Sequence, residues 1–282
     1  MIYISSSCVK AEKIATSVEV LAKEGFLNIE LSGGTQHYEG FEDDLLELKD
    51  KYKLNYLLHN YFPAPKKHFV LNLASPNSAI VEASTLHIKR ALSLATKLDS
   101  KKYGIHAGFN IDIDVSEIGK LIKNKKIANT EEGIERFVKN FDKIQDFSQK
   151  TKLYIENNVI SHSNYEEYQQ KNPFLLVSSL GYEQLKKQLD FNLLLDIAHL
   201  QVSSKTLNLD YEKELTKLIP KSDYIHISDN DGFHDTNQPI KKDSLMYQLL
   251  QNHNLNNKTI TLEVYSEINK IKKSYENIAR LL

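Results

Sequence analysis

The chain has 282 residues, of which 41% are hydrophobic and 26% charged, an ordinary globular balance that excludes a disordered chain. Its 36 lysines and arginines and 37 aspartates and glutamates leave a net charge of −1, which disfavours a protein that binds mainly by neutralising phosphates. The length allows one large α/β barrel or two ordinary domains.

In chain order, short apolar runs rich in β-branched residues alternate with longer stretches whose apolar residues recur close to a 3.6-residue period. The short runs predict eight strands, at residues 2–6, 27–31, 54–59, 102–106, 152–157, 191–196, 223–228 and 259–264. The longer stretches predict helices at residues 11–23, 78–98, 131–148, 182–188, 211–218, 244–251 and 267–281.

Alternating strands and helices require a parallel sheet with right-handed crossovers. Eight such units fit a closed (β/α)8 barrel, formed by a single domain over residues 1–282. An open doubly wound sheet is the alternative, but residues 5–8 after the first strand are not the glycine-rich phosphate turn usual in that fold. The longest irregular stretches, 61–77 and 110–130, each follow a strand, where barrel enzymes place active-site loops.

Cysteine content and hydropathy indicate the compartment. Cys8 is the only cysteine, so no intrachain disulfide can form and a reducing environment is expected. The first residues lack the basic flank of a signal peptide, and no apolar run approaches the ~20 residues of a membrane helix. We therefore expect a soluble, cytoplasmic protein with no membrane partner.

Ionisable side chains lie at or near the ends of at least six predicted strands, where a turn residue would be usual. They are Glu30, His59, His106, Glu156, Asp196, His199, His226, Asp229 and Glu263. Barrel strands end on one face, so these groups would meet at a common centre. Unpaired, they would shift one another's pKa values severely, whereas a divalent cation takes carboxylate oxygen and imidazole nitrogen as ligands. We therefore predict a divalent-metal site, with zinc or manganese favoured.

These residues give the chain a resemblance, over nearly its whole length, to the xylose isomerase-like TIM-barrel superfamily. That superfamily includes sugar and sugar-phosphate isomerases and epimerases, and also endonuclease IV, the abasic-site repair nuclease. The resembling motifs are Gly25-x-x-x-Ile29-Glu30-Leu31, His59-Asn60, His106-Ala107-Gly108, Glu156-Asn157, Asp196-x-x-His199, His226 and Glu263.

The favoured implication is an isomerase or epimerase acting on a sugar or sugar phosphate. The resemblance implies that four residues hold one metal: Glu156, Asp196, His226 and Glu263. The metal would polarise a hydroxy-carbonyl sugar, and Glu156 and Glu263 would move the proton through an enediolate. His199 would stabilise the developing charge.

Other polar residues would then contact the substrate. His59 and His106 would line the sugar site. Lys241 and Lys242, in the loop after the seventh strand, would bind substrate or belong to a solvated loop. The same alternatives apply to the lysines after the fourth strand, Lys120, Lys123, Lys125 and Lys126.

The alternative is a zinc-dependent, endonuclease IV-like phosphodiesterase that binds nucleic acid. The resemblance then implies up to three ions, with additional ligands at His59, His106, His199 and Asp235. Residues 69–76 resemble the endonuclease IV loop after the third-strand histidine, and His106-Ala107-Gly108 resembles its His-Pro-Gly.

Two departures disfavour the nuclease. Asp235-x-Asn237 replaces the nuclease's Asp-x-His, and residues 241–243 replace a Gly-x-Gly. The same departures allow a third alternative, a metal-binding barrel without catalysis.

Overall fold

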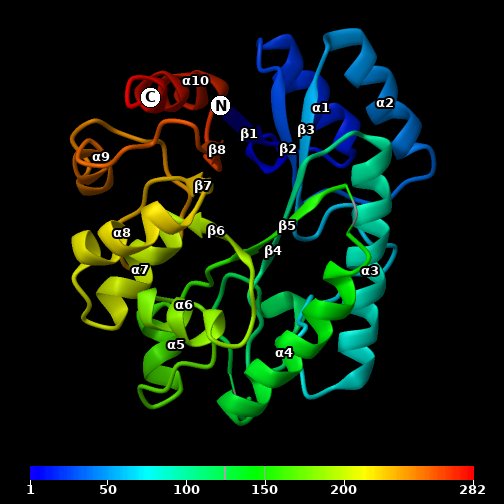
Figure 1. The fold of residues 1–282 in the computed structure, drawn as a ribbon. Helices are drawn as coiled ribbons and strands as arrows, with labels where there is room; N and C mark the ends of the chain where they lie inside the picture. Colours follow the sequence, from blue (N-terminus) through cyan, green and yellow to red (C-terminus); the bar gives the residue numbers. More distant parts are fainter. Residues whose placement is uncertain (124, 149) are drawn as a thin grey trace.

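The strands of the computed structural model, which describes residues 1–123, 125–148 and 150–282, close into one parallel barrel in the order β1 to β8 (Figure 1). Within these residues there are eight strands: β1 Ile2–Ser5, β2 Asn28–Leu31, β3 Asn55–His59, β4 Lys102–His106, β5 Lys152–Glu156, β6 Asn192–Asp196, β7 Tyr224–Ile227 and β8 Thr259–Leu262. β8 pairs with β1, so the sheet has no free edge. The predicted (β/α)8 barrel and all of its strands are confirmed.

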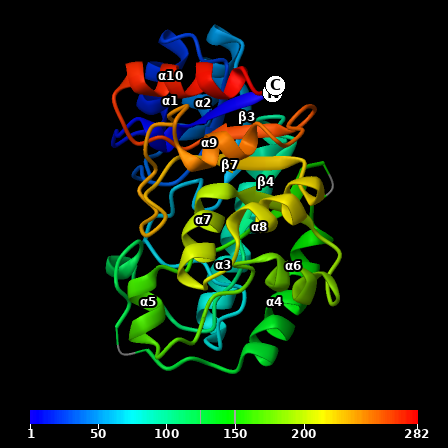
Figure 2. The same ribbon diagram turned by 90° about the vertical axis from the view of Figure 1, so that its left-hand side faces the viewer.

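Helices surround this barrel on its outer side (Figure 1). In the described residues they are α1 Ile14–Lys23, α2 Phe41–Tyr52, α3 Ser78–Lys97, α4 Thr130–Gln145, α5 His162–Glu167, α6 Ser179–Lys186, α7 Ile197–Thr206, α8 Tyr211–Leu218, α9 Leu245–Leu250 and α10 Ile268–Ala279. The last helix packs beside the first elements of the chain (Figure 2), and the Met1 ammonium donates to the Lys258 carbonyl at 3.0 Å.

Helices α2, α5 and α7 are absent from the sequence prediction. α2 buries only Leu45 and Leu48, so its apolar stripe is thin. α7 begins directly after β6 with no intervening loop, and residues 197–204 are buried on every side, which hides a helical period. His199 accordingly lies in the first turn of α7, not on the strand.

Two layers of side chains fill the barrel along its axis. Alternate residues of a strand face the same side, so a residue two positions later lies one layer nearer the carboxyl end. The inner layer is a buried cluster made of Tyr3, Leu57, Tyr154, Leu194 and Tyr224. Two positions later on the same strands lie five buried polar residues, Ser5, His59, Glu156, Asp196 and His226. An apolar floor therefore supports an ionisable layer.

Gly104 occupies the inner layer on β4 because no larger residue fits there. A β-carbon would lie 2.6 Å from Leu194 Cδ2 and 3.0 Å from His59 Cδ2. The missing side chain leaves room for the His59 ring, and two residues later His106 joins the ionisable layer.

The predicted irregular stretches follow β3 and β4. Residues 61–77 contain no helix or strand. The stretch 110–130 contains the 3-10 helix Val115–Glu117, and its residue 124 lies outside the described residues. No helix among the described residues is long and apolar enough to cross a membrane.

Candidate metal centre

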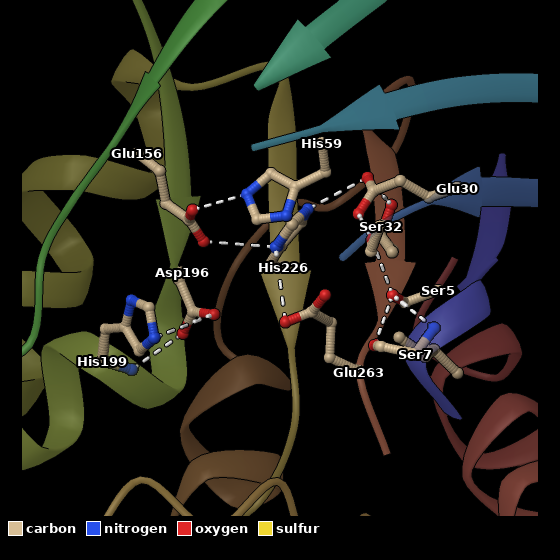
Figure 3. Close-up of polar contacts among 12 residues, drawn as sticks. Ser5, Ser7, Glu30, Ser32, His59, Glu156, Asp196, His199, His226 and Glu263 are labelled. Atoms are coloured by element: carbon tan, nitrogen blue, oxygen red, sulfur yellow. Dashed lines mark hydrogen bonds and ion pairs between the residues drawn. The ribbon is translucent and has the colours of Figure 1, made fainter. Parts of the chain in front are cut away.

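Glu156, at the end of β5, faces three imidazoles of the ionisable layer, those of His59, His106 and His226. Figure 3 shows its contacts with His59 and His226. Its Oε2 is hydrogen-bonded to His59 Nε2 at 2.7 Å and lies 3.1 Å from His106 Nδ1. Its Oε1 lies 3.2 Å from His226 Nδ1. Glu156 is almost completely buried, so water does not screen these contacts.

His226, on β7, connects the two sides of the centre. Its Nε2 is hydrogen-bonded to Glu30 Oε2 at 3.0 Å. Its Nδ1 faces both Glu156 Oε1, at 3.2 Å, and Glu263 Oε2, at 3.9 Å. Figure 3 shows Glu156 and Glu263 pointing toward the ring of His226 from two sides.

Several buried atoms of this centre lack hydrogen bonds within the described part of the chain. They are His226 Nδ1, His106 Nδ1 and Glu156 Oε1. Buried polar atoms are nearly always hydrogen-bonded, so unsatisfied nitrogens that face unsatisfied carboxylate oxygen indicate a missing partner. A divalent cation accepts both kinds of ligand and satisfies both at once. The residues therefore fit a metal.

A second group lies around His199. Its Nδ1 is hydrogen-bonded to the Asn157 carbonyl at 2.9 Å, which leaves Nε2 3.2 Å from Asp235 Oδ2 and 3.9 Å from Asp196 Oδ2. Asp196 Oδ1 also accepts from the His199 amide at 2.7 Å and so caps α7. These two hydrogen bonds fix the Asp196 carboxylate and the His199 ring beside each other.

All eight predicted metal ligands lie in this connected cluster, but in smaller groups. Three groups have potential ligand atoms within 4.8 Å of one another: Glu30, His59, His226 and Glu263; His59, His106 and Glu156; and Glu156, Asp196 and His199. The predicted set of Glu156, Asp196, His226 and Glu263 is thus divided between groups that share residues. Glu30 belongs to the first group; the sequence placed it among the strand-end residues but not among the predicted ligands.

The predicted lysines lie elsewhere. Lys241 lines a surface hollow of about 660 Å³ between α7, α8 and the loop after β7, and Lys242 is exposed. Lys125 is paired with Asp114 at 2.6 Å in its own loop. Asn237 is buried and accepts a hydrogen bond from the Tyr265 amide through its backbone carbonyl.

Burial and neighbouring charges shift the pKa values of Glu156 and Glu263 in opposite directions. Burial raises the pKa of Glu156, but His106, His59 and His226 outweigh it and hold this pKa well below its usual range. Burial also raises the pKa of Glu263, and here it prevails over His226 and His59. Burial raises the pKa of Asp196 to about 7. Without metal, the pKa of Glu156 therefore lies below that of Glu263.

Known proteins share this architecture. A family model described as a xylose isomerase-like TIM barrel matches residues 18–281. No curated protein matches the chain. A crystal structure of a D-tagatose 3-epimerase-like protein is 19% identical, with a TM-score of 0.72 over 99% of this chain and 96% of that one.

Two further solved structures differ in their activities. D-psicose 3-epimerase with D-tagatose from Clostridium cellulolyticum is 13% identical, with a TM-score of 0.64 over 99% of this chain and 91% of that one. Endonuclease IV from Thermus thermophilus is 12% identical, with a TM-score of 0.61 over 99% of this chain and 98% of that one. At these identities the likeness shows the shared fold alone.

Proposed function

Because this chain belongs to the xylose isomerase-like TIM barrel family, we propose that it is a metal-dependent enzyme that isomerises or epimerises a sugar. The observation that carries the proposal is the pair Glu156 and Glu263, which face His226 Nδ1 from two sides at 3.2 and 3.9 Å. Two carboxylates on either side of a bound sugar can take a proton from carbon and return it.

A divalent ion, zinc or manganese, held by Glu156, Asp196, His226 and Glu263, would polarise the sugar carbonyl and acidify the adjacent C–H bond. Glu156, which is ionised in the metal-free protein because its pKa lies well below its usual range, would be the proton acceptor. Glu263, whose pKa is the higher of the two, would return a proton to carbon. Environments that separate the pKa values of two carboxylates in this way are typical of acid–base pairs.

Exposure indicates the side from which the sugar enters. The side chains of His226 and Glu156 are at most 1% exposed, whereas Glu263 is 12% and His106 is 27% exposed. Glu263 and His106 therefore face the substrate. His199, oriented by the Asn157 carbonyl, directs Nε2 toward the same mouth and would bind a substrate oxygen on which charge develops.

The test is deuterium uptake from D2O into a panel of ketoses, aldoses and their phosphates, followed by NMR. Metal-loaded protein should exchange a carbon-bound proton of its substrate, and EDTA should stop the exchange. Glu156→Gln and Glu263→Gln should each abolish it. Glu47→Gln, at an exposed position on α2, is the matched control and should retain full activity. Exchange that survives both active-site changes, or no exchange by metal-loaded protein across the panel, refutes the proposal.

The second candidate function is hydrolysis of a phosphodiester at an abasic site. It is favoured by the sharing of Glu156 and His59 between potential metal groups, since a shared carboxylate suits a site with several ions. The test is metal-dependent nicking of a duplex oligonucleotide with one abasic site, with Glu263→Gln as the control. Nicking that this variant lacks would replace the isomerase proposal.

A further inference from the structure

We propose that Glu30 is a positioning residue that orients the imidazole of His226, so that Nδ1 rather than Nε2 faces the metal. This inference rests on the metal centre of the proposed function, although its first test needs no metal. Glu30 lies on β2, on the far side of His226 from Glu156 (Figure 3).

Both oxygens of the Glu30 carboxylate accept hydrogen bonds. Oε2 accepts from the Tyr224 hydroxyl, from Thr261 Oγ1 at 2.8 Å and from His226 Nε2 at 3.0 Å. Oε1 accepts from Ser32 Oγ at 3.3 Å. The carboxylate has no exposed surface, and donors from three strands or their ends restrain it.

These hydrogen bonds distinguish Glu30 from the predicted ligands around it. Glu156 Oε1 and His226 Nδ1 are buried without a hydrogen bond among the described residues, so each can bind a metal once Nδ1 has lost its proton. Both oxygens of Glu30 are already engaged. Although Glu30 lies within 4.8 Å of potential ligand atoms of His59, His226 and Glu263, its geometry is that of a support.

The support acts through the two nitrogens of His226. A carboxylate bound to Nε2 keeps the proton on that nitrogen, which leaves the lone pair on Nδ1 for the metal. Nδ1 then faces the Glu156 and Glu263 oxygens. A polar chain holds Glu30 from the β1 side, because Ser5 Oγ donates to Ser32 Oγ at 2.8 Å.

The test compares Glu30→Gln with Thr261→Val. Glutamine keeps the shape of Glu30 but replaces one carboxylate oxygen with an NH2 group, which would face the hydrogen-bond donors that now surround Glu30. Thr261→Val keeps the side-chain shape, removes one donor to the same oxygen and leaves the contact with His226, so it controls for the loss of a hydrogen bond to Glu30. The readouts are the 15N and 1H resonances of the His226 ring in metal-free protein, and the manganese and zinc affinities from competition titration.

Glu30→Gln should lose the Nε2–H resonance of His226 and bind either metal about 10–100-fold more weakly, as is usual when such a support is removed. Thr261→Val should keep both properties. A Glu30→Gln variant with the wild-type resonance and affinity overturns the inference.

Two further outcomes keep the test decisive. If Glu30→Gln does not fold, the metal-loaded wild-type spectrum decides. A proton on Nδ1, with Nε2 bound to the metal, then overturns the inference, and a proton on Nε2 supports it. If the wild type binds no metal, the proposed function fails, and the metal-free spectrum still tests the role of Glu30.

Discussion

Replacing Glu156 with glutamine should destabilise the metal-free protein by about 3–5 kcal/mol at pH 6, the usual cost of breaking a buried ion pair. The change keeps the shape of the side chain and removes the charge that His59 and His226 face at 2.7 and 3.2 Å. Burial lowers the pKa of both imidazoles. For His59 the charge of Glu156 outweighs this effect, and for His226 the charges of Glu30 and Glu156 do so. Their net pKa values are raised, so both rings are protonated at pH 6.

The loss of stability caused by Glu156→Gln should become smaller as the pH rises. A raised histidine pKa contributes stability that is fully present below the unfolded value of about 6.5 and is lost as the pH rises through the folded value. At pH 9 the wild type has lost part of this contribution, so Glu156→Gln has less to remove. At pH 6 the expected loss corresponds to about 6–20 °C in Tm, at about 2–4 °C per kcal/mol.

The assay is urea unfolding at pH 6 and pH 9 in EDTA. The matched control is Glu214→Gln. That buried carboxylate accepts from the Ser179 amide and hydroxyl at 2.5 and 2.7 Å and has no histidine partner among the described residues, so its loss should be equal at both pH values. The reasoning is refuted if Glu156→Gln lowers the free energy of unfolding by less than about 1 kcal/mol at pH 6. It is also refuted if the loss is equal at pH 6 and pH 9.

Three further predictions concern metal and packing. Metal loading should raise Tm more at pH 8 than at pH 6, because binding must displace the protons that the raised pKa values of the ligands His226 and Asp196 retain; equal rises in calorimetry contradict this. Gly104→Ala should cost about 1–3 kcal/mol and weaken metal binding, because the new methyl group meets Leu194 and His59; wild-type stability in urea would show that the barrel has room there. His59→Ala should leave the metal count by mass spectrometry unchanged at one ion per chain, and a lost ion would instead favour the multinuclear, nuclease-like site.

The barrel could be predicted from the sequence because its strands are buried on both faces and therefore read as short, continuous apolar runs. The family resemblance rested on residues at the ends of those runs, and the family match confirms it. Helix α2 could have been found from its charges, since Glu42, Asp43 and Asp44 begin it and Lys49 and Lys51 end it, as the helix dipole favours.

The cluster could be anticipated in outline but not in detail. Register along the strands brings His59, Glu156 and His226 to one level, and the sequence contains that register. Which nitrogen of His226 faces which carboxylate depends on side-chain rotamers, and the pattern of apolar residues along the sequence does not specify these. The role of Glu30 depends on hydroxyls from Tyr224 and Thr261, distant in the chain. The position of Lys241 follows the path of an irregular loop.

The most direct test of the metal centre is anomalous X-ray scattering from crystals of the protein loaded with manganese or zinc. We predict one strong peak at bonding distance, about 2.0–2.2 Å, from His226 Nδ1 and from carboxylate oxygens of Glu156 and Glu263. A loaded crystal with no peak at these atoms, or with the peak on His226 Nε2, would contradict the account.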